Sequence, residues 1–190
     1  TTFDEIKLKL DKLYKQLKDP RKKRWGYIES GSLPYSYILH KMKDVERRRP
    51  LVSYRKHPFR RIFNVASRMI TFIANTLETK HCNLSRCTDL LDRITKIQRL
   101  AHAKHGKHAR FVYKMGDIKN MYTELRHEVI IKALDWALNT FRRQTRRNML
   151  SATKYGRKGV YVGHTTLDSE IKLSLAVIRK IVLFDLENAV

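Results

Sequence analysis

Hydrophobic side chains recur at helical spacing from the start of the chain. Phe3, Ile6, Leu10, Leu13 and Leu17 are separated mainly by lysines and other polar residues. Apolar residues three and four positions apart fall on one face of a helix, so this stretch predicts an amphipathic helix. We expect the helix to end before the proline that follows, because proline does not continue a helix.

Four more stretches with this spacing predict helices along the rest of the chain. The stretch over 58–80 carries one apolar stripe, most of which we expect to lie in the core. Asn83 or Ser85 would cap one of these helices. The expected ranges are 58–80, a segment from the cap to Leu100, a segment that begins at Arg126 and extends through Phe141, and 167–186.

Turn residues and short apolar runs predict strands between the helices. Gly31, Ser32 and Pro34 indicate a turn, which precedes a strand over 35–42. A basic turn over 47–50 would join this strand to a second one over 51–54. We also expect a polar, basic loop over 102–108, a short buried strand over 111–115 and a hairpin over 154–162. The predicted class is therefore α/β of the α+β type, rich in helix.

The charge of the chain changes this picture of an ordinary small domain. Lys and Arg number 41 against 18 Asp and Glu, which leaves a net charge of +23 on 190 residues. Self-repulsion at this density opposes compaction unless a polyanion neutralises it. The hydrophobic fraction of 42% is that of a folded protein. These properties favour a protein that binds the phosphate backbone of nucleic acid.

An anionic membrane is the alternative polyanion. No stretch approaches the roughly 20 apolar residues that a membrane-spanning helix needs. No predicted helix shows an exposed face of Trp and Phe of the kind that accompanies interfacial binding. We therefore expect nucleic acid rather than membrane as the partner, and peripheral membrane binding stays the third hypothesis.

Two clusters of basic residues are candidate contacts with nucleic acid. The first is Arg21, Lys22, Lys23 and Arg24, which Trp25 and Tyr27 follow closely; a solvated helix end explains it equally well. The second lies at the end of the helix that begins at Arg126, where cations suit the helix dipole. Four arginines exceed what the dipole requires, so we interpret this cluster as an RNA contact. Its members are Arg142, Arg143, Arg146 and Arg147.

Cysteine and histidine residues give weaker signals. Cys82 and Cys87 are too few for a disulfide framework, and the N-terminus, which starts at Thr1, has no signal pattern. We read the start as internal and the chain as intracellular and reduced. A zinc site would draw on His81, Cys82, Cys87, His102, His105 and His108, but their spacing matches no zinc knuckle. A basic loop explains these histidines better, and no bound cofactor is expected in isolation.

The segment 115–125 carries the candidate chemistry. Asp117 would follow the buried strand over 111–115, and Tyr122 comes shortly after it, before a helix. Nucleotidyl transfer uses a carboxylate to hold Mg²⁺ against a triphosphate, and an aromatic beside the sugar can exclude or admit a 2′-hydroxyl. An Asp at the end of a strand is more often a cap or a turn residue, so the position alone does not establish the chemistry.

This segment resembles the first palm motif of reverse transcriptases, most closely that of the Penelope-like retroelement family. Asp117, the run 121–123 and Leu125 fill the places of the aspartate, Leu-Tyr-Thr and the turn into a helix. Upstream, 39–43 and 49–53 correspond to the fingers signatures of the types Leu-Pro-Lys-x-His-Lys and Arg-Pro-Ile-Val-Ser. The resemblance covers roughly 35–141. It departs from the family at His40, Lys43 and Arg126.

The resemblance implies a role for each matching residue. Asp117 would be a catalytic ligand of Mg²⁺, and Tyr122 would be the aromatic that discriminates the sugar. Lys41 and Arg49 would contact the triphosphate from the fingers, a task that suits a guanidinium because it pairs bidentately with phosphate. Other basic residues of the fingers would contact nucleic acid. These are Lys43, Arg47 and Arg48.

The resemblance also implies a division of the chain and two competing functions. Residues 1–34 would form an N-terminal helix and basic linker, 35–110 a fingers-like region, and 111–190 part of a palm. The Gly-rich and Asp-Asp motifs of a polymerase are not in this sequence. We therefore expect a non-catalytic, RNA-binding scaffold in a large ribonucleoprotein such as a mitochondrial ribosome. The alternative is the N-terminal part of an active or split RNA-directed DNA polymerase.

These two functions imply different partners. A scaffold would bind ribosomal or other RNA together with proteins of the ribonucleoprotein. A polymerase fragment would bind an RNA/DNA duplex and a C-terminal polypeptide that completes the site. The mitochondrion and the nucleus are both compatible with this composition.

Overall fold

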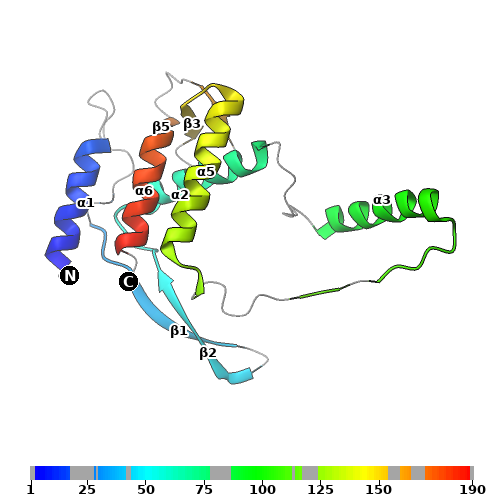
Figure 1. Cartoon of the computed structure of the whole chain (residues 1–190). Coiled ribbons are helices and arrows are strands. Elements are labelled where there is room, and N and C mark those ends of the chain that lie inside the picture. Colours follow the sequence, from blue (N-terminus) through cyan, green and yellow to red (C-terminus); the bar gives the residue numbers. More distant parts are fainter. Residues whose placement is uncertain are drawn as a thin grey trace. The chain divides into compact units, whose positions relative to one another are not determined.

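The structure of the protein is a computed structural model that describes residues 3–17, 28, 30–41, 44–77, 87–112, 114–116, 124–153, 159–163 and 170–188. The chain divides into two compact units, a larger unit of Thr1–Leu77 with Arg126–Val190 and a smaller unit of Glu78–Leu125. The described residues contain five helices and two antiparallel sheets, which confirms the predicted mixture of helix and strand (Figure 1). The elements are α1 (Phe3–Leu17), β1 (Tyr35–Lys41), β2 (Asp44–Ser53), α2 (Arg60–Thr76), α3 (Cys87–His105), α5 (His127–Thr145), β3 (Met149–Thr153), β4 (Val160–Val162), β5 (Glu170–Ser174) and α6 (Leu175–Asn188).

The core of the larger unit is built around α2. Its predicted apolar stripe is confirmed: Ile62, Val65, Ala66, Met69 and Ile73 are all buried. Helices α5 and α6 and the sheet of β3, β4 and β5 pack against this helix. Full burial of one large apolar side chain contributes roughly 1.5–3 kcal/mol relative to exposure, so this stripe contributes substantially to the stability of the unit.

Helix α5 was predicted correctly, but it buries a narrower face than its sequence suggests. Leu134, Leu138 and Phe141 are buried, whereas Val129 is 48% exposed. Ala133 is exposed as well. The first two turns of α5 therefore expose part of the apolar stripe to solvent, and the buried residues begin at Leu134.

The C-terminal sheet corrects the prediction of a single helix over 167–186. Residues 170–174 form β5, which pairs antiparallel with β3 and places Leu173 opposite Leu150. Ile171 and Leu173 are 3% and 1% exposed, so alternate residues of β5 enter the core. Helix α6 begins directly after β5, where the Val177 amide donates to Ser174 Oγ at 3.2 Å in the manner of an N-cap.

The second strand of the hairpin predicted over 154–162 is present in the structure. Residues 160–162 form β4, which pairs with β3 so that Leu150 lies opposite Val162. Strand β3, which pairs with both of its neighbours, was not predicted, and 154–158 lie outside the described residues. Gly159 has a φ of 90°, a conformation that favours glycine, and it leads the chain into β4.

Strands β1 and β2 form the predicted N-terminal hairpin, but the basic segment 47–50 is not its turn. This segment continues β2, and Pro50 lies opposite Ile38 in the register. Both strands of a two-stranded ribbon are edge strands, where the missing N–H of proline is tolerated. Strand β1 ends at Lys41 and β2 begins at Asp44, so the connection between the two strands is shorter than predicted.

The turn predicted at Gly31 is confirmed and holds the chain before β1. The Gly31 amide donates to the Ile28 carbonyl at 2.9 Å, and the Ser32 amide donates to the Lys56 carbonyl at 2.9 Å. A Cβ atom at Gly31 would lie 2.8 Å from each of the Ile28 and Lys56 carbonyl oxygens. This close approach of two backbone segments requires glycine.

The smaller unit contains α3, which is longer than predicted. The helix continues to His105, so the loop expected over 102–108 begins only at Gly106, where φ is 83°. Its apolar residues Leu91, Ile97 and Leu100 are 59–67% exposed. These three residues are therefore not core residues within the described part of the unit.

Candidate nucleic-acid interface

The C-terminal end of α5 is the described place where predicted contact residues come together. Arg142, Arg143 and Arg146 line one surface hollow of about 700 Å³, together with Trp136 and Asn139. Side chains at these positions share one side of the helix, because residues three, four and seven apart align along its axis. The opposite side of the same helix carries Leu138 and Phe141 into the core.

The helix end that carries these arginines is anchored to the core. Arg146 adopts a left-handed conformation with φ of 54°, and its amide donates to the Arg142 carbonyl at 2.9 Å. Thr145 Oγ1 donates to the Phe141 carbonyl at 2.8 Å and accepts from the Arg147 amide at 3.2 Å. Because Phe141 is fully buried, this network fixes the backbone from which the arginines project.

The left-handed residue at the helix end is an arginine rather than the usual glycine. A non-glycine residue in this conformation costs roughly 1–2 kcal/mol relative to right-handed backbone. The turn allows the chain to leave α5 and enter β3 at Met149 within a few residues. It also keeps Arg146 beside the hollow instead of continuing the helical spiral.

The electrostatics of the hollow favour an anion. None of the five side chains that line it is a carboxylate, and three are guanidinium groups. The helix dipole places about half a negative charge at this end, which three arginines more than offset. Arg143 is held in part by an Nη2 donation to Thr140 Oγ1 at 3.4 Å. The arginines are exposed and can therefore approach a ligand.

The acid on α5 next to Trp136 is already paired. Arg179 of α6 donates from Nε to Asp135 Oδ1 at 2.6 Å and from Nη2 to Asp135 Oδ2 at 3.0 Å. The hydrogen bond from Arg179 lowers the pKa of Asp135 below its usual value. The same hydrogen bond raises the pKa of Arg179. This bidentate pair ties α5 to α6 and reduces the repulsion that Asp135 would exert on an anion.

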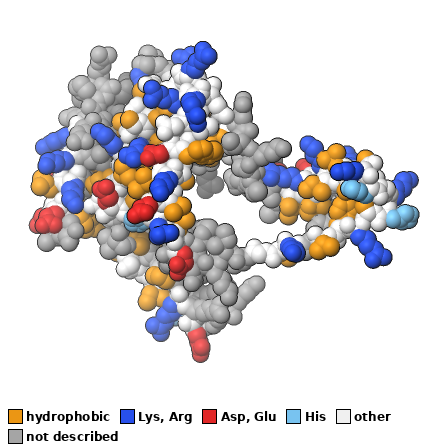
Figure 2. Space-filling model, viewed as in Figure 1, with side chains coloured by type: hydrophobic (Ala, Val, Ile, Leu, Met, Phe, Trp, Pro, Cys, Tyr) orange, Lys and Arg blue, Asp and Glu red, His pale blue; other side chains and the backbone are white. Residues whose placement is uncertain are grey.

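Basic side chains are also scattered over the described surface of the larger unit that is visible in Figure 2. They are interspersed with fewer Asp and Glu, as the excess of 41 over 18 requires. Arg147, which follows Arg146 in the chain, is exposed, and so is Arg48 on β2. The arginine-rich hollow is therefore one feature of a surface that is basic in general.

Several predicted site residues lie outside the described part of the chain. These are Arg21, Lys22, Lys23, Arg24, Lys43, Asp117 and Tyr122. Lys41, Arg47 and Arg49 belong to the strands of the hairpin, but their side chains are also outside the described residues. The predicted gathering of Lys41, Arg49 and Asp117 around a nucleotide thus stays a prediction.

The strand predicted before Asp117 is absent from the described residues 111–112 and 114–116. Val112 is 86% exposed and Met115 is fully exposed, so this segment is not buried. The apolar run that suggested a strand has no partner strand in the described structure. The prediction of a short buried strand was wrong.

Metal-ligating side chains do not gather in the part of the chain that the structure describes. No three His, Cys, Asp or Glu side chains there lie close enough to hold a metal ion. His102 and His105 belong to exposed positions of α3, and His102 contacts the ring of Phe111 at 5.6 Å between centroids. No described helix is long and apolar enough to cross a membrane.

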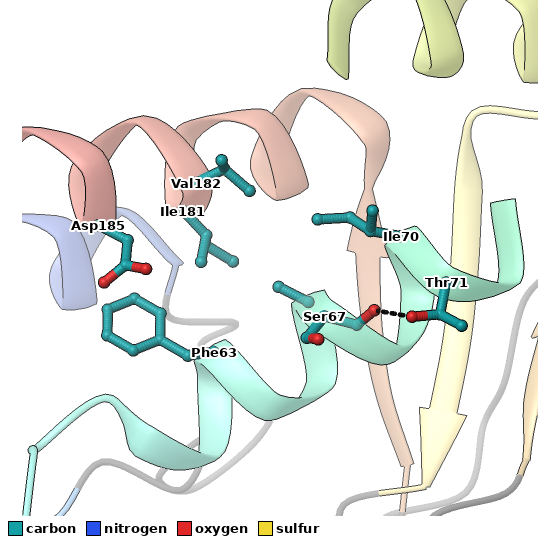
Figure 3. Close-up of a pocket in the computed structure, with 8 residues that line it drawn as sticks. Phe63, Ser67, Ile70, Thr71, Ile181, Val182 and Asp185 are labelled. Carbon is teal, nitrogen blue, oxygen red and sulfur yellow. Dashed lines mark hydrogen bonds between the residues drawn. The ribbon is translucent and has the colours of Figure 1, made fainter. Parts of the chain in front are cut away.

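A second hollow, of about 230 Å³, lies between α2 and α6 (Figure 3). Its lining is mostly apolar, with the Asp185 carboxylate near the ring of Phe63. Asp185 Oδ1 accepts a hydrogen bond from the Tyr54 hydroxyl at 3.0 Å. Burial raises the pKa of Asp185, and burial together with the nearby carboxylate raises the pKa of Tyr54. This pair fastens the end of the hairpin to α6 and is a structural contact.

Trp136 and Asn139 were not predicted as site residues. Trp136 is 51% exposed although it is among the largest apolar side chains. Its signal was available: it precedes Arg143 by seven residues, close to two helical turns, and so lies on the side of α5 away from Leu138. Trp136 is not part of the apolar stripe of this helix, so the hydrophobic pattern alone does not indicate it.

Comparison with known proteins found no match. No protein-family model matches this sequence, and no curated protein and no solved structure is significantly similar to it.

Proposed function

We propose that this chain is an RNA-binding, reverse-transcriptase-derived scaffold of a large ribonucleoprotein, for example a mitochondrial ribosome, and that it has no catalytic activity of its own. The observation that carries the proposal is the group of three arginines around one hollow at the end of α5. Guanidinium groups bind phosphate bidentately, and neutralising phosphates would relieve the repulsion of a chain with a net charge of +23.

The assignment to a scaffold rather than a polymerase rests on the segment before Asp117. A palm-type site needs its first carboxylate at the end of a buried strand, whereas the described residues 111–112 and 114–116 form no strand, and Val112 and Met115 are exposed. The resemblance of 115–125 to the first palm motif is the observation that favours the alternative, the N-terminal part of an RNA-directed DNA polymerase that uses Mg²⁺.

Isolation of the tagged chain from cells, followed by ultraviolet crosslinking, tests the proposal. We expect RNA and ribonucleoprotein components to copurify, with crosslinks at the end of α5. Copurification of a polypeptide that carries an Asp-Asp motif would favour the polymerase. Retention on anionic liposomes in the presence of excess RNA would favour membrane binding.

A primer-extension assay with Mg²⁺ and an RNA template separates the scaffold from the enzyme. We expect no extension from the chain alone or from the copurified complex. Extension by the complex that Asp117→Asn abolishes would refute a purely structural role.

A further inference from the structure

The hollow at the end of α5 combines arginines with an exposed tryptophan. Binding to the phosphates of a duplex would require the arginines but not the tryptophan. Three arginines provide charge, and Trp136 presents 51% of its surface to solvent. In a duplex the bases are stacked on one another, so an exposed indole meets an unpaired base or none. We propose that the hollow binds single-stranded RNA, with an unpaired base stacked on Trp136 and the adjoining phosphates paired with Arg142, Arg143 and Arg146.

The spacing along α5 is consistent with base stacking on Trp136 and phosphate binding by the arginines. Seven residues separate Trp136 and Arg143, which corresponds to a rise of about 10 Å along nearly two helical turns. The indole and the guanidinium therefore lie along one line of the helix surface, and Arg146 follows at the left-handed end. Successive groups of an extended strand, first a base and then phosphates, would meet them in this order.

Asn139 lies between the aromatic and the arginines and also lines the hollow. Its amide carries both a donor and an acceptor, which matches the edge of an unpaired base. The hollow, at about 700 Å³, falls within the range of about 300–1,000 Å³ that small-molecule sites occupy. A nucleotide-sized group can thus enter it.

The surroundings of Trp136 argue against a purely structural role for its ring. The helix turns that contain it are held to the core by Leu134, Leu138 and Phe141, which are buried on the opposite side. The ring stays half exposed on a basic surface, and the neighbouring Asp135 is neutralised by Arg179. Removal of the ring should therefore affect ligand binding more than folding.

This inference rests on the proposed function, since it specifies the ligand of the same hollow. A reporter chain is available because the sequence has only two tryptophans, Trp25 and Trp136. In a Trp25→Phe background, the fluorescence of Trp136 reports stacking directly. We would titrate this chain with a single-stranded RNA, with an abasic strand of equal length, and with a duplex.

We expect the single-stranded RNA to quench Trp136, whereas the abasic strand binds through its phosphates without quenching. Trp136→Ala should weaken binding of the base-containing strand by about 5- to 150-fold, the range for one stacked base. The same substitution should leave affinity for the abasic strand and for the duplex unchanged. Trp136→Phe should restore most of the lost affinity, which a loss of folding would not allow.

Two outcomes would overturn the inference in distinguishable ways. If the single strand binds with arginine-dependent affinity but Trp136→Ala has no effect, stacking is wrong and the proposed RNA binding survives. If none of the three ligands binds, both the stacking and the proposed function fail.

Discussion

Replacement of Arg142, Arg143 and Arg146 together by glutamine should remove the phosphate contacts of the hollow while preserving its shape. The three side chains are exposed, and each glutamine keeps a long polar stem at its position. We expect the variant to fold normally and to bind single-stranded RNA more weakly. The difference should depend strongly on salt, since each neutralised phosphate releases counterions.

The magnitude follows from the number of arginines around the hollow. Each contact contributes about 0.7 to the slope of log affinity against log salt for a single strand, so three contacts contribute about 2. Between 50 and 200 mM salt, a slope difference of about 2 reduces the ratio of wild-type to variant RNA affinity by roughly 20-fold. The wild-type protein should therefore bind RNA more tightly than the variant by the largest factor at low salt and by the smallest factor at high salt.

Fluorescence anisotropy with a labelled RNA over this salt range measures both slopes. A matched control replaces Lys7, Lys9 and Lys12 of α1 by glutamine, which removes the same charge from exposed positions of another helix. The control should change the slope less than the triple arginine variant does. Equal slopes for the two variants would refute a specific contact at α5 and would leave only a general attraction of charge.

Three further predictions concern the fold. Burial lowers the pKa of His57 to about 4. Between pH 6.5 and 4 this histidine is therefore protonated in the unfolded chain but neutral in the folded chain. The free energy of unfolding should therefore be unaffected by this histidine above pH 6.5 and should fall by up to about 3 kcal/mol as the pH drops to 4. NMR should show the His57 imidazole titrating near pH 4, and a titration near the usual 6.5 would contradict the prediction. Phe141→Ala should lower the free energy of unfolding by about 3–5 kcal/mol in urea, because the ring is fully buried, whereas Val112→Ala, at an 86% exposed position, should change it by less than about 0.5 kcal/mol. Gly31→Ala should lower it by about 1–3 kcal/mol because its Cβ would meet two carbonyl oxygens at 2.8 Å, whereas Gly116→Ala, with open space around it, should be neutral; equal thermal shifts for the two glycine variants would contradict the predicted clash.

The helices were the most predictable part of this protein. Helices α1, α2 and α5 follow from apolar residues at a period of 3.6, which is a local property of the sequence. The β1–β2 hairpin was recognisable from its turn residues and apolar runs. Its connection was misplaced because Arg47–Pro50 has the composition of a turn but pairs as an edge strand.

The segments that were mispredicted depend on partners elsewhere in the chain. Residues 170–174 are compatible with a helix, yet they form β5 because β3 offers hydrogen bonds and a place for Ile171 and Leu173 in the core. The run 111–115 shows the reverse case. It has the composition of a buried strand, but no described strand pairs with it, and Val112 and Met115 remain exposed.

The candidate site divides in the same way. The arginines at the end of α5 could be identified from the sequence, because four of them within a few residues exceed what a helix end requires. Their common hollow with Trp136 and Asn139 was not predicted, since it depends on which side of α5 is buried and on the left-handed turn at Arg146.

The sequence by itself determined the net charge of +23, the helical periods and the clustering of basic residues, because these are properties of composition and of neighbours along the chain. The tertiary structure decided which apolar runs enter the core, where β3 finds its two partner strands, and which side chains of α5 face solvent beside the arginines. The physical reason is the same in each case. Burial and strand pairing require groups that lie far apart in the chain, and these contacts can override a local pattern.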